Sequence, residues 1–278
     1  MMLRQFLNPP NWFTAASMFC GLYSIVLATG VGGEQNFYRA GLMILFAGVF
    51  DTIDGSVARL TKTGSEFGIQ LDSLVDVVSF GIAPAMLLYA WGTHSLGVLG
   101  LAGAFFFALC GVFRLARFNC KADGTKHAFT EGLTITMGGA MVAAAVMAHA
   151  RALPDTELNP FGVLAIAFCL ALLMVSSVPY RGWKTLRLRR RDILGIALVL
   201  GFTLLMAVRF DISLAFFSAL AVYSASGPVE ALLTRRWSVG DEHLQPAAAR
   251  GGGPLPSGAL SGDQDQDHDE LDEEDEGP

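Results

Sequence analysis

The feature that most constrains this chain is a series of eight apolar windows, each close to the length that crosses a lipid bilayer. A transmembrane helix needs about 20 consecutive apolar residues. The last two windows are short and adjacent, so they form either a tight helical hairpin or one re-entrant element. We therefore expect an all-α fold, a polytopic membrane bundle of about eight transmembrane helices, with windows at residues 12–31, 37–58, 69–91, 96–116, 133–151, 161–179, 193–209 and 211–227.

Lysine and arginine are distributed unevenly between the alternate loops. With the N-terminus inside, one side of the membrane collects 16 of the 19 basic residues, and the other keeps Arg39, Arg151 and Arg209. Cytoplasmic loops carry such an excess of positive charge. The pattern predicts both termini in the cytoplasm (N-in/C-in) for a multi-pass protein of the cell inner (plasma) membrane. The basic run 181–191 is either a topogenic signal or a surface for anionic lipid headgroups.

The formal net charge of −6 combines two pieces of opposite sign. Residues 1–240 carry 18 basic against 13 acidic residues, whereas residues 241–278 carry 1 against 12. Asp263–Glu276 alone holds ten acids in fourteen positions, and such a segment cannot bury enough apolar area to become ordered. We predict a transmembrane domain over residues 1–228 and a disordered acidic cytoplasmic tail over residues 229–278. We expect the body to contact the lipid bilayer and no nucleic acid.

Four carboxylates lie inside the second and third apolar windows, where acids are rare, costly and usually functional. Asp51 and Asp54 are three residues apart, and Asp72 and Asp76 are four apart, so each pair shares one face of a helix. Small residues flank both pairs and allow the two helices to approach closely. Four carboxylates brought together at low dielectric repel one another unless a cation joins them.

Oxygen ligands without histidine or cysteine favour Mg²⁺, Mn²⁺ or Ca²⁺ over zinc. The acids lie toward the cytoplasmic ends of their windows, with Arg59 at the boundary and Gly55 leaving space beside the helix. A divalent metal, an arginine and a glycine beside membrane lipid indicate phosphoryl transfer. Two other interpretations are buried ion pairs between these acids and nearby arginines, and a cation transporter, which would place its acids near the bilayer midplane.

The same residues resemble the signature of the CDP-alcohol phosphatidyltransferases. The match consists of Asp51-Thr-Ile-Asp54-Gly55-Ser-Val-Ala58-Arg59, then eight residues to Gly68, three to Asp72 and three to Asp76. All eight defining positions are present with intact spacing. The resemblance implies a divalent metal cofactor, Mg²⁺ or Mn²⁺, held by Asp51, Asp54, Asp72 and Asp76, with Asp76 also the catalytic base. It further implies a nucleotide and diphosphate surface formed by Asn11, Thr14, Gly55, Ala58, Arg59 and Gly68.

Within this family the chain is most similar to the integral-membrane bacterial phosphatidylserine synthases. The segments that carry this similarity begin at Pro10, Asp76 and Phe113, and the resemblance covers roughly residues 8–185. One position departs from the pattern, because Thr134 follows Leu133 where those enzymes often have a proline. The subgroup implies transfer of a phosphatidyl group from CDP-diacylglycerol to L-serine, with release of CMP, at the cytoplasmic face. Family membership also implies a homodimer.

The acceptor side is less defined than the nucleotide side. Arg114 and Arg117 are three residues apart on one helical face and, with Asn119 and Ser79, are candidates for binding the acceptor or the lipid phosphate. Alternatively, the arginines anchor the helix at the membrane surface, and Ser79 bonds its own helix backbone. A phosphatidylcholine synthase remains an alternative; it would bind choline with an aromatic or acidic cage. A transferase for a phosphorylated acceptor would need more basic residues.

Overall fold

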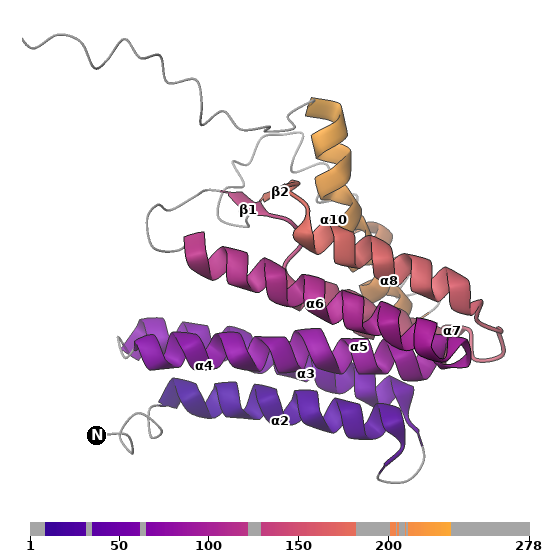
Figure 1. Ribbon diagram of the computed structural model, residues 1–278, viewed down its shortest axis with the longest axis horizontal. Helices are drawn as coiled ribbons and strands as arrows, with labels where there is room; N and C mark the ends of the chain where they lie inside the picture. The colour runs from indigo at the N-terminus through magenta and orange to yellow at the C-terminus, as the bar shows by residue number, and fades with distance from the viewer. Residues whose placement is uncertain are drawn as a thin grey trace, which may run out of the picture. The chain divides into compact units, whose positions relative to one another are not determined.

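The structure is a computed structural model that describes residues 9–31, 35–61, 65–121, 129–181 and 211–234, together with residues 201–203, 205 and 209. In these ranges it is helical apart from one short pair of strands (Figure 1). The elements in chain order are α2 (Pro9–Thr29), α3 (Phe37–Thr61), α4 (Glu66–Asp76), η1 (Val77–Ile82), α5 (Ala83–Leu88), η2 (Tyr89–Thr93), η3 (His94–Leu96), α6 (Val98–Lys121), β1 (Phe129–Glu131), α7 (Ile135–Ala152), α8 (Pro160–Val175), β2 (Pro179–Arg181) and α10 (Ile212–Thr234).

Six of the described helical segments are long and apolar enough to cross a membrane. They correspond to six of the eight windows expected from the sequence, and the third is a continuous segment, Glu66–Leu96. The window at 161–179 forms α8, which is apolar but only 16 residues long. The window at 193–209 lies mostly outside the described residues, which include only 201–203, 205 and 209 of it. The helical bundle is therefore confirmed, whereas eight crossings and the N-in/C-in orientation stay predictions.

The third span is not a uniform α-helix. The segments η1 and η2 are π-helical, and η1 begins directly after Asp76. A π-turn changes which side of the helix the following residues face, and such turns are frequent at functional sites. Because η1 separates α4 from α5, the aspartates of α4 and the apolar residues of α5 can face different neighbours.

Glycines hold η1 between two other helices. A Cβ at Gly21 of α2 would lie 2.8 Å from the Cα of Ser79, and a Cβ at Gly139 of α7 would lie 2.9 Å from the carbonyl oxygen of Phe80. Phe80 is 1% exposed and Ser79 is fully buried. Inside a bilayer the hydrophobic effect does not drive helices together. Contacts between helices there are therefore rich in small residues, which let the two backbones approach closely. The segment after Asp76 is thereby fixed against α2 and α7.

The strand β1, which precedes α7, pairs with β2, which follows α8. The strands pair antiparallel with Thr130 opposite Tyr180, and Gly132 follows β1 with a φ of +73°. A Cβ at Gly132 would lie 2.5 Å from the carbonyl oxygen of Met174, so both the backbone angle and the contact require glycine. This turn leads into α7 and sets the end of α8 beside the end of α6.

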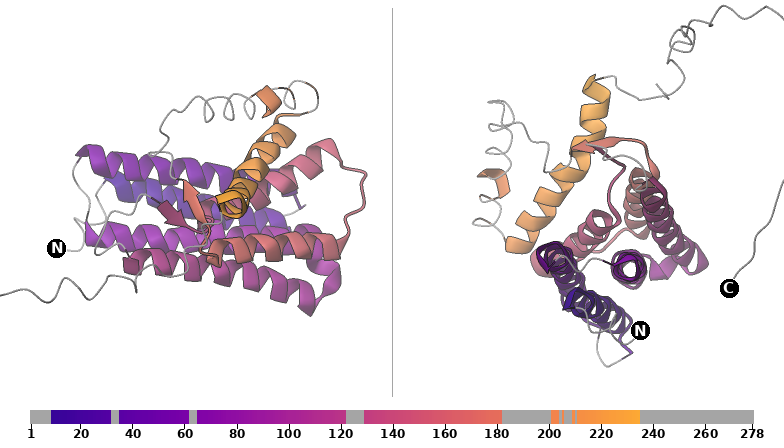
Figure 2. Two further views of the ribbon diagram at one scale, coloured as in Figure 1. Left: turned by 90° about the horizontal axis from the view of Figure 1, so that it is seen from above. Right: turned by 90° about the vertical axis from the view of Figure 1, so that its left-hand side faces the viewer.

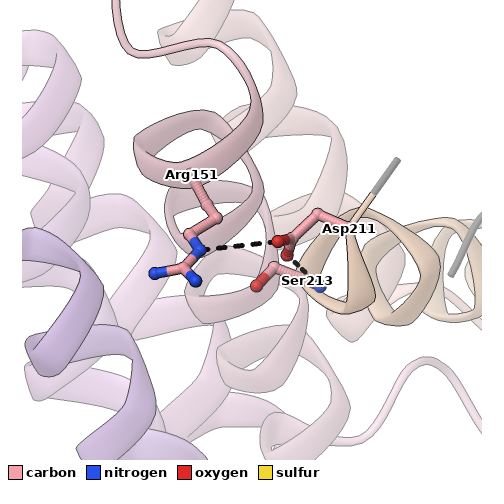
Figure 3. A network of polar contacts seen from close by, with 3 residues as sticks. All are labelled: Arg151, Asp211 and Ser213. Carbon is pink, nitrogen blue, oxygen red and sulfur yellow. Dashed lines mark hydrogen bonds and ion pairs between the residues drawn. The ribbon is translucent and has the colours of Figure 1, made fainter. Parts of the chain in front are cut away.

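The helix α10 packs against α7 and contacts β2, and it crosses the other helices obliquely (Figure 2). Its first turn is fixed by Asp211, which accepts a hydrogen bond from the backbone N–H of Ser213 at 2.8 Å and forms an ion pair with Arg151 of α7 at 3.4 Å (Figure 3). It continues through Pro228 to Thr234, past the domain boundary expected at residue 228. The rest of the expected tail, 235–278, lies outside the described residues.

Candidate active site

The four aspartates predicted from the sequence meet where the end of α3 lies beside the start of the third span. One carboxylate oxygen from each of Asp51, Asp72 and Asp76 lies within 4.8 Å of the others. Asp54 is 5% exposed, and its Oδ2 accepts a hydrogen bond from the hydroxyl of Thr14 at 2.8 Å. The aspartates therefore form a group of three with a fourth anchored to α2.

Local sequence places these side chains. Ser65 is the N-cap of α4, and its hydroxyl accepts a hydrogen bond from the backbone N–H of Gly68 at 3.0 Å. This cap fixes where α4 begins. On that helix Asp72 and Asp76 are four residues apart, so they fall on consecutive turns of one face. On the other side, Thr14 also donates to the carbonyl oxygen of Pro10 at 3.2 Å, which holds its hydroxyl beside Asp54.

A cleft of about 150 Å³ opens beside the aspartates. Its walls come from α2, α3 and the start of α4. The helix α2 packs against both α3 and α4. Of the six residues expected on the nucleotide side, all but Arg59 line it. The lining residues are Pro10, Asn11, Thr14, Asp54, Gly55, Ala58, Ser65, Gly68, Ile69 and Asp72. Two of the four expected metal ligands thus face the same cleft as the expected nucleotide surface.

Two glycines shape the walls of this cleft in different ways. A Cβ at Gly55 would meet nothing within 4 Å, so it would project into open space. A Cβ at Gly68 would lie 3.3 Å from the hydroxyl of Ser65 and 3.5 Å from Oδ1 of Asn11. Arg59 lies in the last turn of α3, exposed, and its Nη2 donates to the Ser56 hydroxyl at 3.4 Å.

The donor set fits a hard divalent cation. Only carboxylate oxygens converge in the group of three, and oxygen ligands are those that Mg²⁺ and Mn²⁺ prefer. Three negative charges at such separations in a largely apolar bundle repel strongly, and a divalent ion removes this repulsion. Asp51, Asp72 and Asp76 could hold the ion, with Asp54 next to them on the same helix face as Asp51.

The four residues expected on the acceptor side differ in how their polar atoms are bonded. The Ser79 hydroxyl donates to the carbonyl oxygen of Ser17 at 3.1 Å, between η1 and α2. Nδ2 of Asn119 donates to the Ser73 hydroxyl at 3.0 Å, between α6 and α4. Both bonds join helices around the aspartates.

The two arginines differ in the same respect. The guanidinium of Arg117 donates to the carbonyl oxygens of Val175 at 2.9 Å, Ser176 at 3.1 Å and Glu131 at 3.4 Å. Arg114 is 7% exposed, and its Nε has no hydrogen-bond partner in the described part of the chain. Its guanidinium carbon lies 5.3 Å from the centre of the Phe118 ring. Arg117 thus caps the end of α8, whereas Arg114 keeps a buried donor unpaired.

Three residues of the cleft were not among the sequence candidates: Pro10, Ser65 and Ile69. Ser65 carried a signal, because a serine directly before the first residue of a helix is a common N-cap. Pro10 precedes Asn11 and Ile69 follows Gly68, and neither residue has a side chain that indicates a place in a binding cleft.

Comparisons with known proteins match the part of the chain that contains these residues. Residues 7–183 match the family model for CDP-alcohol phosphatidyltransferase. The chain is 34% identical over 181 residues to the CDP-diacylglycerol–serine O-phosphatidyltransferase of Helicobacter pylori, covering 64% of this chain and 73% of that protein. It is 32% identical over 177 residues to the enzyme of that name from Bacillus subtilis, covering 63% and 90%. It is 34% identical over 182 residues to the archaetidylserine synthase of Methanothermobacter thermautotrophicus, covering 64% and 71%.

Proposed function

Because the chain belongs to the CDP-alcohol phosphatidyltransferase family, we propose that it is a phosphatidylserine synthase. It transfers the phosphatidyl group of CDP-diacylglycerol to the hydroxyl of L-serine and releases CMP. The observation that carries this function is the meeting of the aspartates of α3 and α4 beside the cleft. It is supported by the relatives with that enzyme name, which are similar to this chain over most of their own length.

The cleft binds the nucleotide and diphosphate of CDP-diacylglycerol. Gly55 leaves its open wall without a side chain, and Asn11, Thr14, Ala58 and Gly68 form the rest of the surface. Arg59, exposed in the last turn of α3, is placed to contact a phosphate that enters from the membrane surface. Thr14 has a second role, because its hydroxyl fixes the orientation of Asp54.

Asp51, Asp54, Asp72 and Asp76 hold the divalent metal, which when bound stabilises negative charge on the diphosphate. The carboxylate of Asp76 accepts the proton of the serine hydroxyl. The serine oxygen forms a bond to the phosphorus that carries diacylglycerol. The bond from that phosphorus to the CMP oxygen breaks, and CMP leaves.

We further propose that the site opens at the cytoplasmic face of the inner membrane and that the enzyme is a homodimer. The orientation is supported by the 16 basic residues that the sequence places on one side. The homodimer is supported by the family resemblance.

The experiment that tests the function is a turnover assay with purified protein, CDP-diacylglycerol and labelled L-serine. We expect CMP and labelled lipid in equal amounts with Mg²⁺ or Mn²⁺ and none after chelation, because the clustered carboxylates need a cation. Asp76→Asn is the inactive control. Choline is offered in parallel, and turnover with choline but not with serine would overturn the serine assignment.

A further inference from the structure

Arg114 holds an unpaired donor in an unusual position. It is 7% exposed on α6, and its buried Nε has no hydrogen-bond partner in the ranges that the structure describes. Leaving a buried charged donor unpaired is costly, so such a group usually has a partner that is absent from the structure. The ring of Phe118 packs against the guanidinium plane but accepts no ordinary hydrogen bond.

Its surroundings place Arg114 on the reacting side of the site. Arg114 lies within electrostatic range of its neighbour Arg117, of Asp76, the proposed base, and of Tyr223 of α10. It does not line the cleft that holds the expected nucleotide surface. A ligand bound to Arg114 would therefore approach Asp76 from outside the nucleotide cleft, which is what a second substrate must do.

Tyr223 comes from a helix outside residues 7–183, the part that matches the family. Tyr180 of β2 fixes this helix: its hydroxyl donates to the carbonyl oxygen of Ser224 at 2.9 Å, and the two tyrosine rings lie 5.8 Å apart. Burial raises the pKa of Tyr180 to about 12, so its hydroxyl stays protonated and keeps donating at physiological pH. Gly227 is required here, because a Cβ would lie 2.5 Å from the Tyr180 ring.

We propose that Arg114 and Tyr223 together bind the carboxylate of the acceptor amino acid, so that α10 contributes to acceptor selection. This inference rests on the proposed function. A planar guanidinium matches a carboxylate with two parallel hydrogen bonds, and a phenol hydroxyl can donate a third. In serine the carboxylate is two carbon–carbon bonds from the carbon that bears the hydroxyl, so both groups can be held at once near Arg114 and Asp76.

Arg117 and Asn119 have a different role, as positioning residues. Arg117 is engaged with three carbonyl oxygens and Asn119 with Ser73, which follows the ligand Asp72 directly. Arg117 therefore offers a matched control: it is the same residue type on the same helix, three residues from Arg114.

The test compares L-serine with ethanolamine, which is serine without its carboxylate, as acceptors for the wild type, Tyr223→Phe, Arg114→Gln and Arg117→Gln. We expect Tyr223→Phe to raise the KM for serine about tenfold, since it removes one hydrogen bond to a charged group. Arg114→Gln should raise it further. In both variants the preference for serine over ethanolamine should fall while the KM for CDP-diacylglycerol is unchanged. Arg117→Gln should lower the melting temperature and leave the preference intact.

Each other result overturns the inference in a distinct way. A rise in the KM for CDP-diacylglycerol with an unchanged KM for serine would assign Arg114 to the lipid phosphate. An equal loss of activity with both acceptors would make Arg114 and Tyr223 structural. If the wild type itself releases no CMP with serine, the proposed function fails, and this result is separate from any difference between variants.

Discussion

Gly55 and Gly48 lie two turns apart on α3 and have different surroundings. A Cβ at Gly55 would enter the open cleft, whereas a Cβ at Gly48 would make an ordinary contact at 3.7 Å with the ring of Phe80. Alanine is favoured over glycine in a helix by about 0.5–1 kcal/mol at either position. The pair therefore separates an effect on the cleft from an effect on the helix.

We predict that Gly55→Ala raises the KM for CDP-diacylglycerol by about tenfold, because an added methyl group in a fitted site costs on the order of 1–3 kcal/mol. Gly48→Ala should leave this KM unchanged, and both variants should melt at or slightly above the wild-type temperature. Steady-state kinetics and thermal unfolding in detergent measure the two effects. An unchanged KM for Gly55→Ala would show that the substrate does not approach this wall.

Thr134 has a structural role that its departure from the family pattern does not indicate. It stands where the family resemblance predicts a proline, and its φ of −69° is the angle that proline also adopts. In addition, its hydroxyl accepts a hydrogen bond from the backbone N–H of Met137 at 3.2 Å and so caps α7. The departure from the pattern therefore keeps the backbone and adds a cap, which the sequence alone did not reveal.

Asn119 and Ser73 form a bond between α6 and α4, the helix that carries two of the aspartates. We predict that Asn119→Ala and Ser73→Ala each lower kcat several-fold by loosening α4, with a coupling of about 1 kcal/mol, the value of one hydrogen bond. Because one bond is lost in either case, the double variant should be no worse than the poorer single variant.

The measurement is a double-mutant cycle on kcat and on the melting temperature. If the two losses add, the bond between Asn119 and Ser73 carries no function, and Asn119 acts on the substrate instead. The serine-over-ethanolamine preference should be the same in all four proteins, which distinguishes positioning from binding.

At the scale of elements, periodicity and composition predicted the main helices, and the spacing of Asp51, Asp54, Asp72 and Asp76 predicted which faces converge. The π-turns of η1 and η2 were not predictable, because no residue pattern distinguishes them from α-helix in an apolar run. The roles of Arg114 and Arg117 were also inseparable in sequence. Only the packing of α8 shows that Arg117 meets a helix end.

At the scale of the whole molecule, the exposure of the native cysteines offers a way to measure the orientation of the protein in the membrane. Cys120 is exposed near the end of α6, one residue after Asn119, which contacts α4 beside the aspartates. Cys20 and Cys110 are buried, and Cys169, although exposed, lies in the middle of the apolar helix α8, where lipid surrounds it. Cys120 is therefore the described thiol best placed to meet water at the end of the bundle that bears the site.

We predict that a membrane-impermeant maleimide labels Cys120 in inside-out vesicles and leaves it unlabelled in right-side-out vesicles. Buried or lipid-facing thiols do not form the reactive thiolate, so Cys120→Ser should remove the label. Labelling from the outer side would place the aspartates on the opposite face from the one that the basic residues predict.

The length of the third span has a consequence for where the reaction takes place in the bilayer. The continuous segment Glu66–Leu96 has 31 residues and is about 46 Å long at a rise of 1.5 Å per residue. The hydrocarbon layer is about 30 Å thick. The excess of about 16 Å is close to the length of α4, which ends at Asp76. The helix can therefore cross the hydrocarbon layer with η1, α5 and the segments that follow, which together are about 30 Å long. Its aspartates are then held at the depth where a diphosphate headgroup meets water.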